Sequence, residues 1–153
     1  MDRTDAYSFF LHETGHALSF NGFRDFGTGQ LTGNFQSIFD QFVELVDIDG
    51  DDVPFFNGDA AVAEYGGLVP LTFGNLYHVG NGSPLPGDDL IPDMMNGVVY
   101  FRGTRYDISA LDLAIASDAG LPLAPVVVPE SGSFALLLPA LALIVRWRKS
   151  PVK

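Results

Sequence analysis

Three residues near the start of the chain, His12, Glu13 and His16, have the types and the spacing of a zinc-binding helix. Residues four apart lie on one face of a helix, so the two imidazoles could bind one Zn²⁺ ion while Glu13 reaches a water molecule at the metal. This pattern supplies two ligands and a general base, whereas a catalytic zinc site needs a third protein ligand and an open position. Because the same spacing also occurs on ordinary solvated helices, the assignment depends on a third ligand elsewhere.

Apolar side chains surround the two histidines: Leu11, Ala17, Leu18 and Phe20. This composition predicts a helix that is buried on several sides. Unpaired imidazole and carboxylate groups would be costly to bury in such a helix. The apolar surroundings therefore favour a metal site over a solvated polar face.

The chain has 3 histidines and no cysteine, so any metal ion must be held by His, Asp or Glu. A protein that uses so few histidines, and places two of them at metal spacing, makes the third one the natural candidate for the missing ligand. That residue is His78. Two acidic residues, Asp25 and Glu64, remain alternatives for the third ligand.

The overall composition describes one acidic domain with a separate tail. The chain has 153 residues, 47% of them apolar, including 13 phenylalanines, which is enough to form the core of one domain and excludes a disordered acidic chain. The net charge of -11 argues against a nucleic-acid partner, because phosphates require clustered Lys and Arg. Residues 1–125 carry 4 basic and 18 acidic residues, whereas residues 126–153 carry 4 basic residues and 1 acidic residue.

The tail has the pattern of a membrane anchor or sorting signal. An uncharged apolar run from Ser133 to Val145 is followed directly by Arg146-Trp147-Arg148-Lys149. A bilayer-spanning helix needs about 20 apolar residues, so this run is marginal as a permanent span and adequate as a transient one, with the basic cluster on the cytoplasmic side. The alternative is a buried helix at the C-terminus.

Together with Val128-Pro129-Glu130-Ser131, this layout resembles the PEP-CTERM sorting signal of bacteria, from which Ser131 departs at the last motif position. The resemblance implies export and processing by an exosortase-type enzyme. The protein would then be anchored in the membrane by its C-terminal helix, or released to the cell surface or extracellular matrix after cleavage.

Between and after the histidines, turn and cap residues mark several further elements. Residues 37–45 have helix or strand content, and Asp47–Asp52 is expected to be an acidic turn, with weak calcium binding as a minority alternative. The remaining predictions are a helix over Ala60–Tyr65 ended by Gly66, a loop over Asn75–Gly87, a strand over Val98–Phe101, and a helix over Ala110–Ala119 capped by Ser109 and ended by Gly120.

Several segments in order resemble a known enzyme family. They are HETGHALSF at 12–20, LYHVGN at 76–81, Asp93-Met94-Met95-Asn96-Gly97, and SALDLAIASDAGLP at 109–122. This order is similar to leishmanolysin-like metzincins, which have a long insertion before a distant third histidine and then a Met-turn. Compact metzincins instead use HExxHxxGxxH, and here Ser19 and Gly22 stand at the glycine and third-histidine positions.

The resemblance implies that His12, His16 and His78 hold Zn²⁺, which when bound would polarise a peptide carbonyl and lower the pKa of a water molecule toward about 7. Glu13 would act as general base and then as general acid. Met95 would form an apolar floor beneath the metal, with Met94 as the alternative. The substrate would be a peptide or protein.

The implied fold is an α+β, mainly helical and loop-rich domain over residues 1–125 that corresponds to the C-terminal half of a metzincin, followed by a hydrophobic helix within 126–153. Only 11 residues precede His12, with no signal peptide among them, so we expect the N-terminal sheet of that family to be largely missing and the chain to be truncated there. Two functions remain. One is an exported zinc endopeptidase, and the other is a non-catalytic surface-anchored protein with a vestigial or structural metal site.

Overall fold

The computed structural model describes residues 3–82 and 84–124. The predicted sorting signal, exosortase site and hydrophobic helix in the tail lie outside the described residues. Within those residues, every helix is too short or too polar to cross a bilayer.

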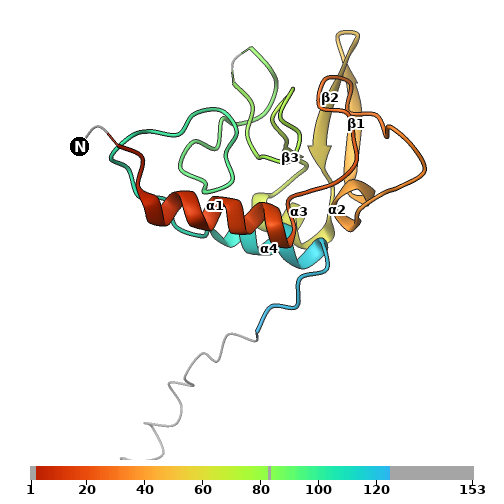
Figure 1. Cartoon of the computed structure of the whole chain (residues 1–153). Helices are drawn as coiled ribbons and strands as arrows, with labels where there is room; N and C mark the ends of the chain where they lie inside the picture. Colours follow the sequence, from red (N-terminus) through yellow and green to blue (C-terminus); the bar gives the residue numbers. More distant parts are fainter. Residues whose placement is uncertain (1–2, 83, 125–153) are drawn as a thin grey trace, which may run out of the picture. The chain divides into compact units, whose positions relative to one another are not determined.

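The body of the chain contains four helices and a small sheet (Figure 1). The helices are α1 (Ala6–Leu18), α2 (Ile38–Gln41), α3 (Asp59–Tyr65) and α4 (Ala110–Asp118). The strands are β1 (Val43–Ile48), β2 (Asp51–Phe56) and β3 (Val69–Pro70), which form an antiparallel sheet in the order β1-β2-β3.

Helix α1 carries His12, Glu13 and His16. It begins after Asp5, whose carboxylate accepts a hydrogen bond from the Ser8 amide at 3.0 Å and forms an ion pair with Arg105. The Ser8 hydroxyl also accepts a hydrogen bond from the Tyr106 amide at 2.7 Å, which fixes the start of α1 against a distant part of the chain.

The prediction that this helix is buried on several sides is wrong. Leu18 is 55% exposed and Phe10 is 68% exposed, whereas Phe20, just beyond the helix, is 2% exposed. The described residues pack against one side of α1 only. Apolar residues occur all round the helix, so local composition did not show which face would be covered.

The sheet lies between the two histidine-bearing segments in the sequence, and sequence analysis identified only part of it. The turn predicted over Asp47–Asp52 is shorter than expected, because only Asp49 and Gly50, with positive φ angles of 57° and 95°, join β1 to β2. The other four residues of this acidic segment lie in the two strands. The Val43↔Phe56 to Ile48↔Asp51 register gives a regular hairpin. Val53 and Phe56 of β2 are both nearly fully buried, but they lie on opposite faces of the strand, and it is Phe56 that belongs to the main hydrophobic core.

Helices α3 and α4 agree with their predicted positions. Gly66 ends α3 in the left-handed conformation, and Ser109 and Asp112 form a reciprocal capping box at the start of α4. The Asp118 carboxylate accepts hydrogen bonds from the Ala60 and Ala61 amides at 3.1 and 2.9 Å, so the end of α4 caps the start of α3.

The prediction of a strand over Val98–Phe101 is wrong, and this segment is irregular. Its backbone groups bind side chains instead of another strand. The Val99 amide donates to the Asn96 side chain at 3.1 Å, and the Phe101 amide donates to the Tyr106 hydroxyl at 3.0 Å. Apolar and β-branched residues predicted a strand here, but no neighbouring strand is present among the described residues to pair with it.

Candidate metal centre

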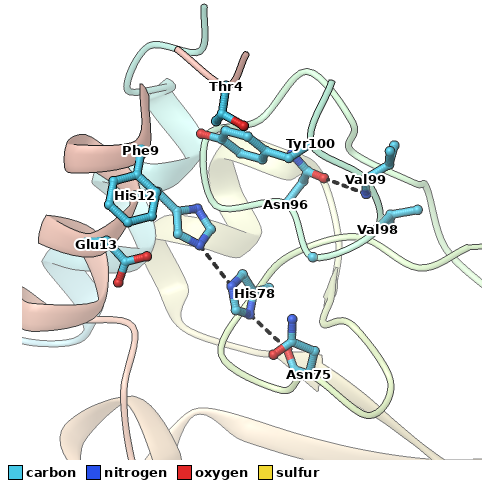
Figure 2. Close-up of a pocket in the computed structure, with 11 residues that line it drawn as sticks. Thr4, Phe9, His12, Glu13, Asn75, His78, Asn96, Val98, Val99 and Tyr100 are labelled. Carbon is cyan, nitrogen blue, oxygen red and sulfur yellow. Dashed lines mark hydrogen bonds between the residues drawn. The ribbon is translucent and has the colours of Figure 1, made fainter. Parts of the chain in front are cut away.

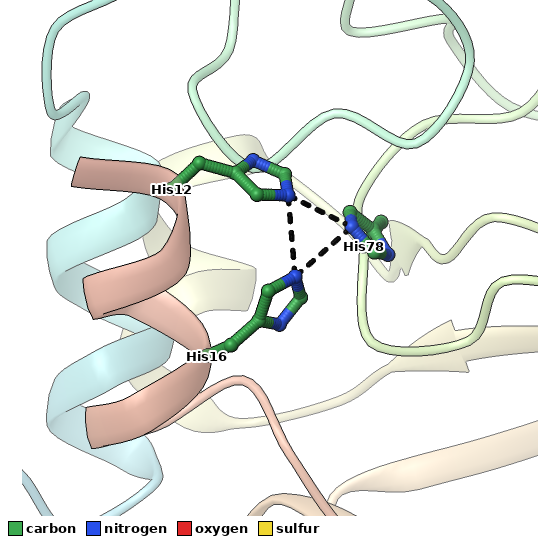
Figure 3. Close-up of side chains that lie close together, drawn as sticks. All are labelled: His12, His16 and His78. Carbon is green, nitrogen blue, oxygen red and sulfur yellow. Dashed lines mark hydrogen bonds between the residues drawn. The ribbon is translucent and has the colours of Figure 1, made fainter. Parts of the chain in front are cut away.

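The three histidines of the chain meet at one point (Figure 3). The Nε2 atom of His12 lies 3.0 Å from that of His78 and 3.2 Å from that of His16. The Nε2 atoms of His16 and His78 lie 3.1 Å apart. Two of these rings come from consecutive turns of α1, and the third comes from a loop 62 residues further along the chain than His16.

The other ring nitrogen of each histidine points to a backbone carbonyl. The Nδ1–H groups of His12 and His16 donate to the carbonyls of Met94 and Phe20, each at 2.8 Å. The Nδ1–H of His78 donates to the carbonyl of Asn75 at 3.2 Å. A carbonyl oxygen only accepts hydrogen bonds, so in each neutral ring the proton resides on Nδ1 and Nε2 carries a free lone pair.

Three lone pairs therefore face one another with no proton between them. Burial lowers the pKa of His12, and burial together with the neighbouring His16 and His12 lowers the pKa of His78 to about 4. Both rings are thus neutral at physiological pH. Such an arrangement is repulsive unless a cation occupies the centre.

The spacing also fits the ligand set of a tetrahedral zinc ion. Zn–N bonds of about 2.0–2.1 Å at tetrahedral angles place ligand nitrogens about 3.3 Å apart, close to the observed 3.0–3.2 Å. The three histidines lie close enough to bind a metal ion.

No protein-family model, curated protein or solved structure matches this chain.

Met95 packs under the helix that carries the first two histidines. It is fully buried, and a Cβ atom at Gly15 would lie 2.5 Å from its Sδ. The absence of a side chain at Gly15, between His12 and His16, therefore lets the methionine approach the helix backbone. Met94 instead lines an apolar groove between α1 and α4, while its carbonyl anchors His12.

His78 is held by backbone pairing on two sides. On one side, the Thr72 amide donates to the His78 carbonyl at 2.9 Å. On the other, the Val79 amide donates to the Met95 carbonyl at 2.9 Å, and the Gly97 amide donates to the Val79 carbonyl at 3.1 Å. The segment Asp93–Gly97, which contains both methionines, is therefore paired directly with the segment that presents His78.

Gly97 makes this pairing sterically possible. A Cβ atom there would lie 2.5 Å from Thr72 Oγ1 and 2.7 Å from His78 Cβ. Any side chain at position 97 would therefore push against the third histidine itself.

A buried polar network fixes the residue before His78. The Tyr77 hydroxyl donates to the Asp40 carboxylate at 2.9 Å and accepts from the Arg24 amide at 2.7 Å. Asp40 is fully buried and also accepts from the Phe23 and Ser37 amides, each at 2.9 Å. Burial raises the pKa of Tyr77 above its ordinary value, so the phenol remains a donor. The network ties the loop after α1 to the loop that holds His78.

A second buried carboxyl pair connects the methionine segment to α4. Asp93 accepts from the Met95 amide at 2.9 Å and from the Ser109 hydroxyl at 2.7 Å. Asp112 is 3% exposed, its Oδ2 accepts from the Ser109 amide at 2.9 Å, and its Oδ1 has no hydrogen-bond partner among the described residues. Burial and Asp93 raise the pKa of Asp112 to about 8, so the Asp112 carboxyl holds a proton at neutral pH.

Glu13 lies at the wall of an open cavity beside the metal centre (Figure 2). This cavity has a volume of about 400 Å³ and is lined by His12, Glu13 and His78 together with apolar residues that include Phe9, Val98 and Val99. Glu13 is exposed, so its carboxylate is accessible to water and to a ligand in this cavity.

The two acidic alternatives for the third ligand lie apart from this cluster. Asp25 Oδ1 accepts hydrogen bonds from its own loop, from the amides of Gly27 and Thr28 and from the Thr28 hydroxyl. Glu64 is exposed on α3. Sequence reasoning missed Asn75 and Tyr100, which line the same cavity as Glu13. Asn75 could have been predicted as a cavity residue from its position three residues before the candidate ligand His78.

Proposed function

We propose that this protein is a zinc-dependent endopeptidase in which His12, His16 and His78 hold the metal and Glu13 transfers protons. One observation carries the proposal. Three imidazole lone pairs converge to within 3.2 Å, and the adjoining cavity has Glu13 in its wall.

Three neutral imidazole nitrogens suit Zn²⁺ among the common metal ions of hydrolases. When bound, zinc would polarise the peptide carbonyl and make a water molecule more acidic. Residues of the chain would orient the ligands and transfer the protons. The carbonyls of Met94, Phe20 and Asn75 keep the Nδ1 proton in place, which leaves all three Nε2 atoms available as ligands.

Glu13 follows His12 directly on α1, so its carboxylate faces the cavity from the same helix that supplies two ligands. In this proposal it accepts a proton from the attacking water and delivers it to the leaving amine. Its exposure allows both transfers without burial of a charged carboxylate.

The open surroundings favour catalysis over a structural site. Structural zinc is normally enclosed by four protein ligands, whereas the described residues bring only three to this centre. A second cavity opens on the His16 side, so the centre is accessible from two directions. Access on both sides suits cleavage within a chain rather than at its end. The order of the zinc-helix segment, distant histidine and methionine segment, which resembles the metzincin layout, also supports a peptidase.

The proposal is tested by replacing Glu13 with an isosteric neutral residue. Zinc-loaded wild type is expected to hydrolyse a quenched-fluorescence peptide library, and Glu13→Gln is expected to bind one zinc ion but to lose hydrolysis by a factor of at least about 100. Glu64→Gln removes an equivalent exposed carboxylate on α3 and should leave the rate unchanged. Hydrolysis retained in Glu13→Gln would contradict the proton-transfer role of Glu13, whereas no hydrolysis by zinc-loaded wild type would support a non-catalytic metal site instead.

A further inference from the structure

A second cavity adjoins the metal centre beside His16, and Glu13 is not among the residues that line it. It has a volume of about 340 Å³ and shares His78 and Asn75 with the Glu13 cavity, while His16 replaces His12 in its wall. Its remaining wall is mostly aromatic, formed by Phe20, Phe26 and Tyr77. The volume falls within the range of about 300–1,000 Å³ that is typical of ligand sites.

Phe26 stands at the mouth of this cavity. Its side chain is 52% exposed, and its ring packs edge-on against Tyr77 with a centroid distance of 5.6 Å and an interplanar angle of 80°. One edge of the ring is therefore fixed by the protein, while the remainder is accessible to a ligand. Other phenylalanines, such as Phe35 and Phe10, are more exposed than Phe26, so the feature that singles out Phe26 is its place in the wall of this cavity.

The loop that carries Phe26 is held by its own hydrogen bonds. The Asp25 amide donates to the Gln30 carbonyl and the Gly29 amide donates to the Asp25 carbonyl, each at 2.8 Å. The Arg24 guanidinium donates to the carbonyls of Gly29 and Asp40 at 2.8 and 2.9 Å. The ring is therefore positioned before any ligand arrives, which lowers the entropic cost of binding.

We propose that the His16-side cavity binds an apolar side chain of the peptide held at the metal, and that Phe26 determines this preference. The proposal deepens the proposed function and rests on it. It names the substrate class as peptides with an aromatic or large aliphatic residue next to the bond at the metal.

The chemistry of the lining favours an apolar group over a cationic one. None of the residues that line the cavity is acidic, and its polar members besides the histidines are neutral: Asn21, Asn75 and the Tyr77 hydroxyl. The acid nearest in sequence, Asp25, directs its Oδ1 to the amides of Gly27 and Thr28. A cationic side chain would therefore lose its hydration without gaining a carboxylate partner.

Three small probes test this preference by binding, without dependence on turnover. N-acetyl hydroxamates of phenylalanine, alanine and arginine present the same metal-chelating group with different side chains. Calorimetric titration into the zinc-loaded full chain is expected to show the phenylalanine probe binding about tenfold more tightly than the other two.

Phe26→Ala should reduce this tenfold preference to less than about twofold, while zinc affinity stays unchanged. Phe35→Ala is the matched control, because Phe35 is 76% exposed on the same loop but does not line the cavity. It should leave the preference intact. A Val99→Ala variant tests the Glu13 cavity in the same way, and it too should leave the preference intact.

Several results would overturn the inference. These are equal binding of all three probes, tighter binding of the arginine probe, an unchanged preference in Phe26→Ala, or a preference lost only in Val99→Ala. In each of these cases the probes still bind, so the metal centre and the proposed function stand. If no hydroxamate binds the zinc-loaded chain, the centre has no accessible position, and both the proposed function and the inference fail.

Discussion

The two halves of the metal centre are built in opposite ways. His12 and His16 lie on α1, a regular helix with much of its apolar surface exposed, including Phe10 and Leu18. His78 lies in an irregular loop, yet its neighbours Tyr77 and Val79 are 5% and 0% exposed. Regular geometry positions the first pair, whereas tertiary contacts position the third ligand.

The difference shows which contacts determine the position of each metal ligand. In a helix, spacing of four residues alone brings two imidazoles together. A loop has no such repeat, so His78 depends on pairing with Thr72 on one side and with the methionine segment on the other. We therefore expect changes around His78 to disturb the centre more than changes of similar size on α1.

Removal of the third histidine should have the largest effect. His78→Ala leaves two ligands on α1, and we expect zinc affinity to fall by more than about a hundredfold, because the loss of a direct ligand exceeds the effect of losing a supporting hydrogen bond. Competition with a fluorescent zinc chelator measures this. Asp25→Ala and Glu64→Ala are the controls, and a loss of affinity in either, with retention in His78→Ala, would reassign the third ligand.

Substitution of Gly97 tests the half of the centre that contains His78 without replacing a metal ligand. Gly97→Ala introduces a Cβ against Thr72 and His78, and we expect it to lower the free energy of unfolding by about 1–3 kcal/mol. Zinc affinity should fall as well, because His78 must move. Gly67→Ala is the matched control, since a Cβ there meets no atom within 4 Å. Equal urea midpoints for the two variants would contradict this packing.

The raised pKa of Asp112 predicts a pH dependence of stability in the same region. The folded pKa of Asp112 is about 8, above the ordinary value of about 3.9, so between these pH values the folded chain holds a proton that the unfolded chain has released. Stability from this pair is therefore greatest at low pH and falls as pH rises toward 8.

Asp112→Asn cannot ionise, and its amide can still donate to Asp93. Relative to wild type, we expect it to gain about 1–3 kcal/mol of stability between pH 5 and pH 9. Urea unfolding at both pH values measures this difference. Titration of the histidines affects the stability of both proteins equally, so it cancels in the comparison. The exposed Asp51→Asn variant should show no gain. A parallel decline in Asp112→Asn and wild type would rule out a proton held by Asp112 in the folded state.

A substitution on α1, which carries His12 and His16, should have the smallest effect. Gly15→Ala places a Cβ 2.5 Å from Met95 Sδ, which is the flexible end of a side chain. Alanine also improves helix propensity by up to about 1 kcal/mol, which offsets part of the clash. We expect a net change within about 1 kcal/mol and zinc affinity within a few-fold of wild type, as measured by the same assays. A larger loss than in Gly97→Ala would reverse the proposed difference between the two halves.

The same contrast explains what the sequence could predict. Spacing identified His12, Glu13 and His16, and cap residues located α3 and α4, because these are local properties. His78 was selected by the small number of histidines in the chain and by the resemblance to a family with a distant third histidine, not by any local spacing. Part of β1 and the turn after it were predicted, but the pairing of the strands β1–β3 and the aromatic cavity at Phe26 were missed, because they depend on contacts between separate segments. Val98–Phe101 was predicted as a strand and is irregular, since side chains satisfy its backbone.

X-ray absorption spectroscopy of the zinc-loaded full chain tests the central claim most directly, because it counts the ligands of the metal. The account predicts one zinc ion per chain with three imidazole nitrogens at about 2.0–2.1 Å and one further light ligand. It also predicts that one imidazole is lost in His78→Ala. Two imidazoles in the wild type, or a spectrum unchanged by His78→Ala, would contradict a centre formed by His12, His16 and His78.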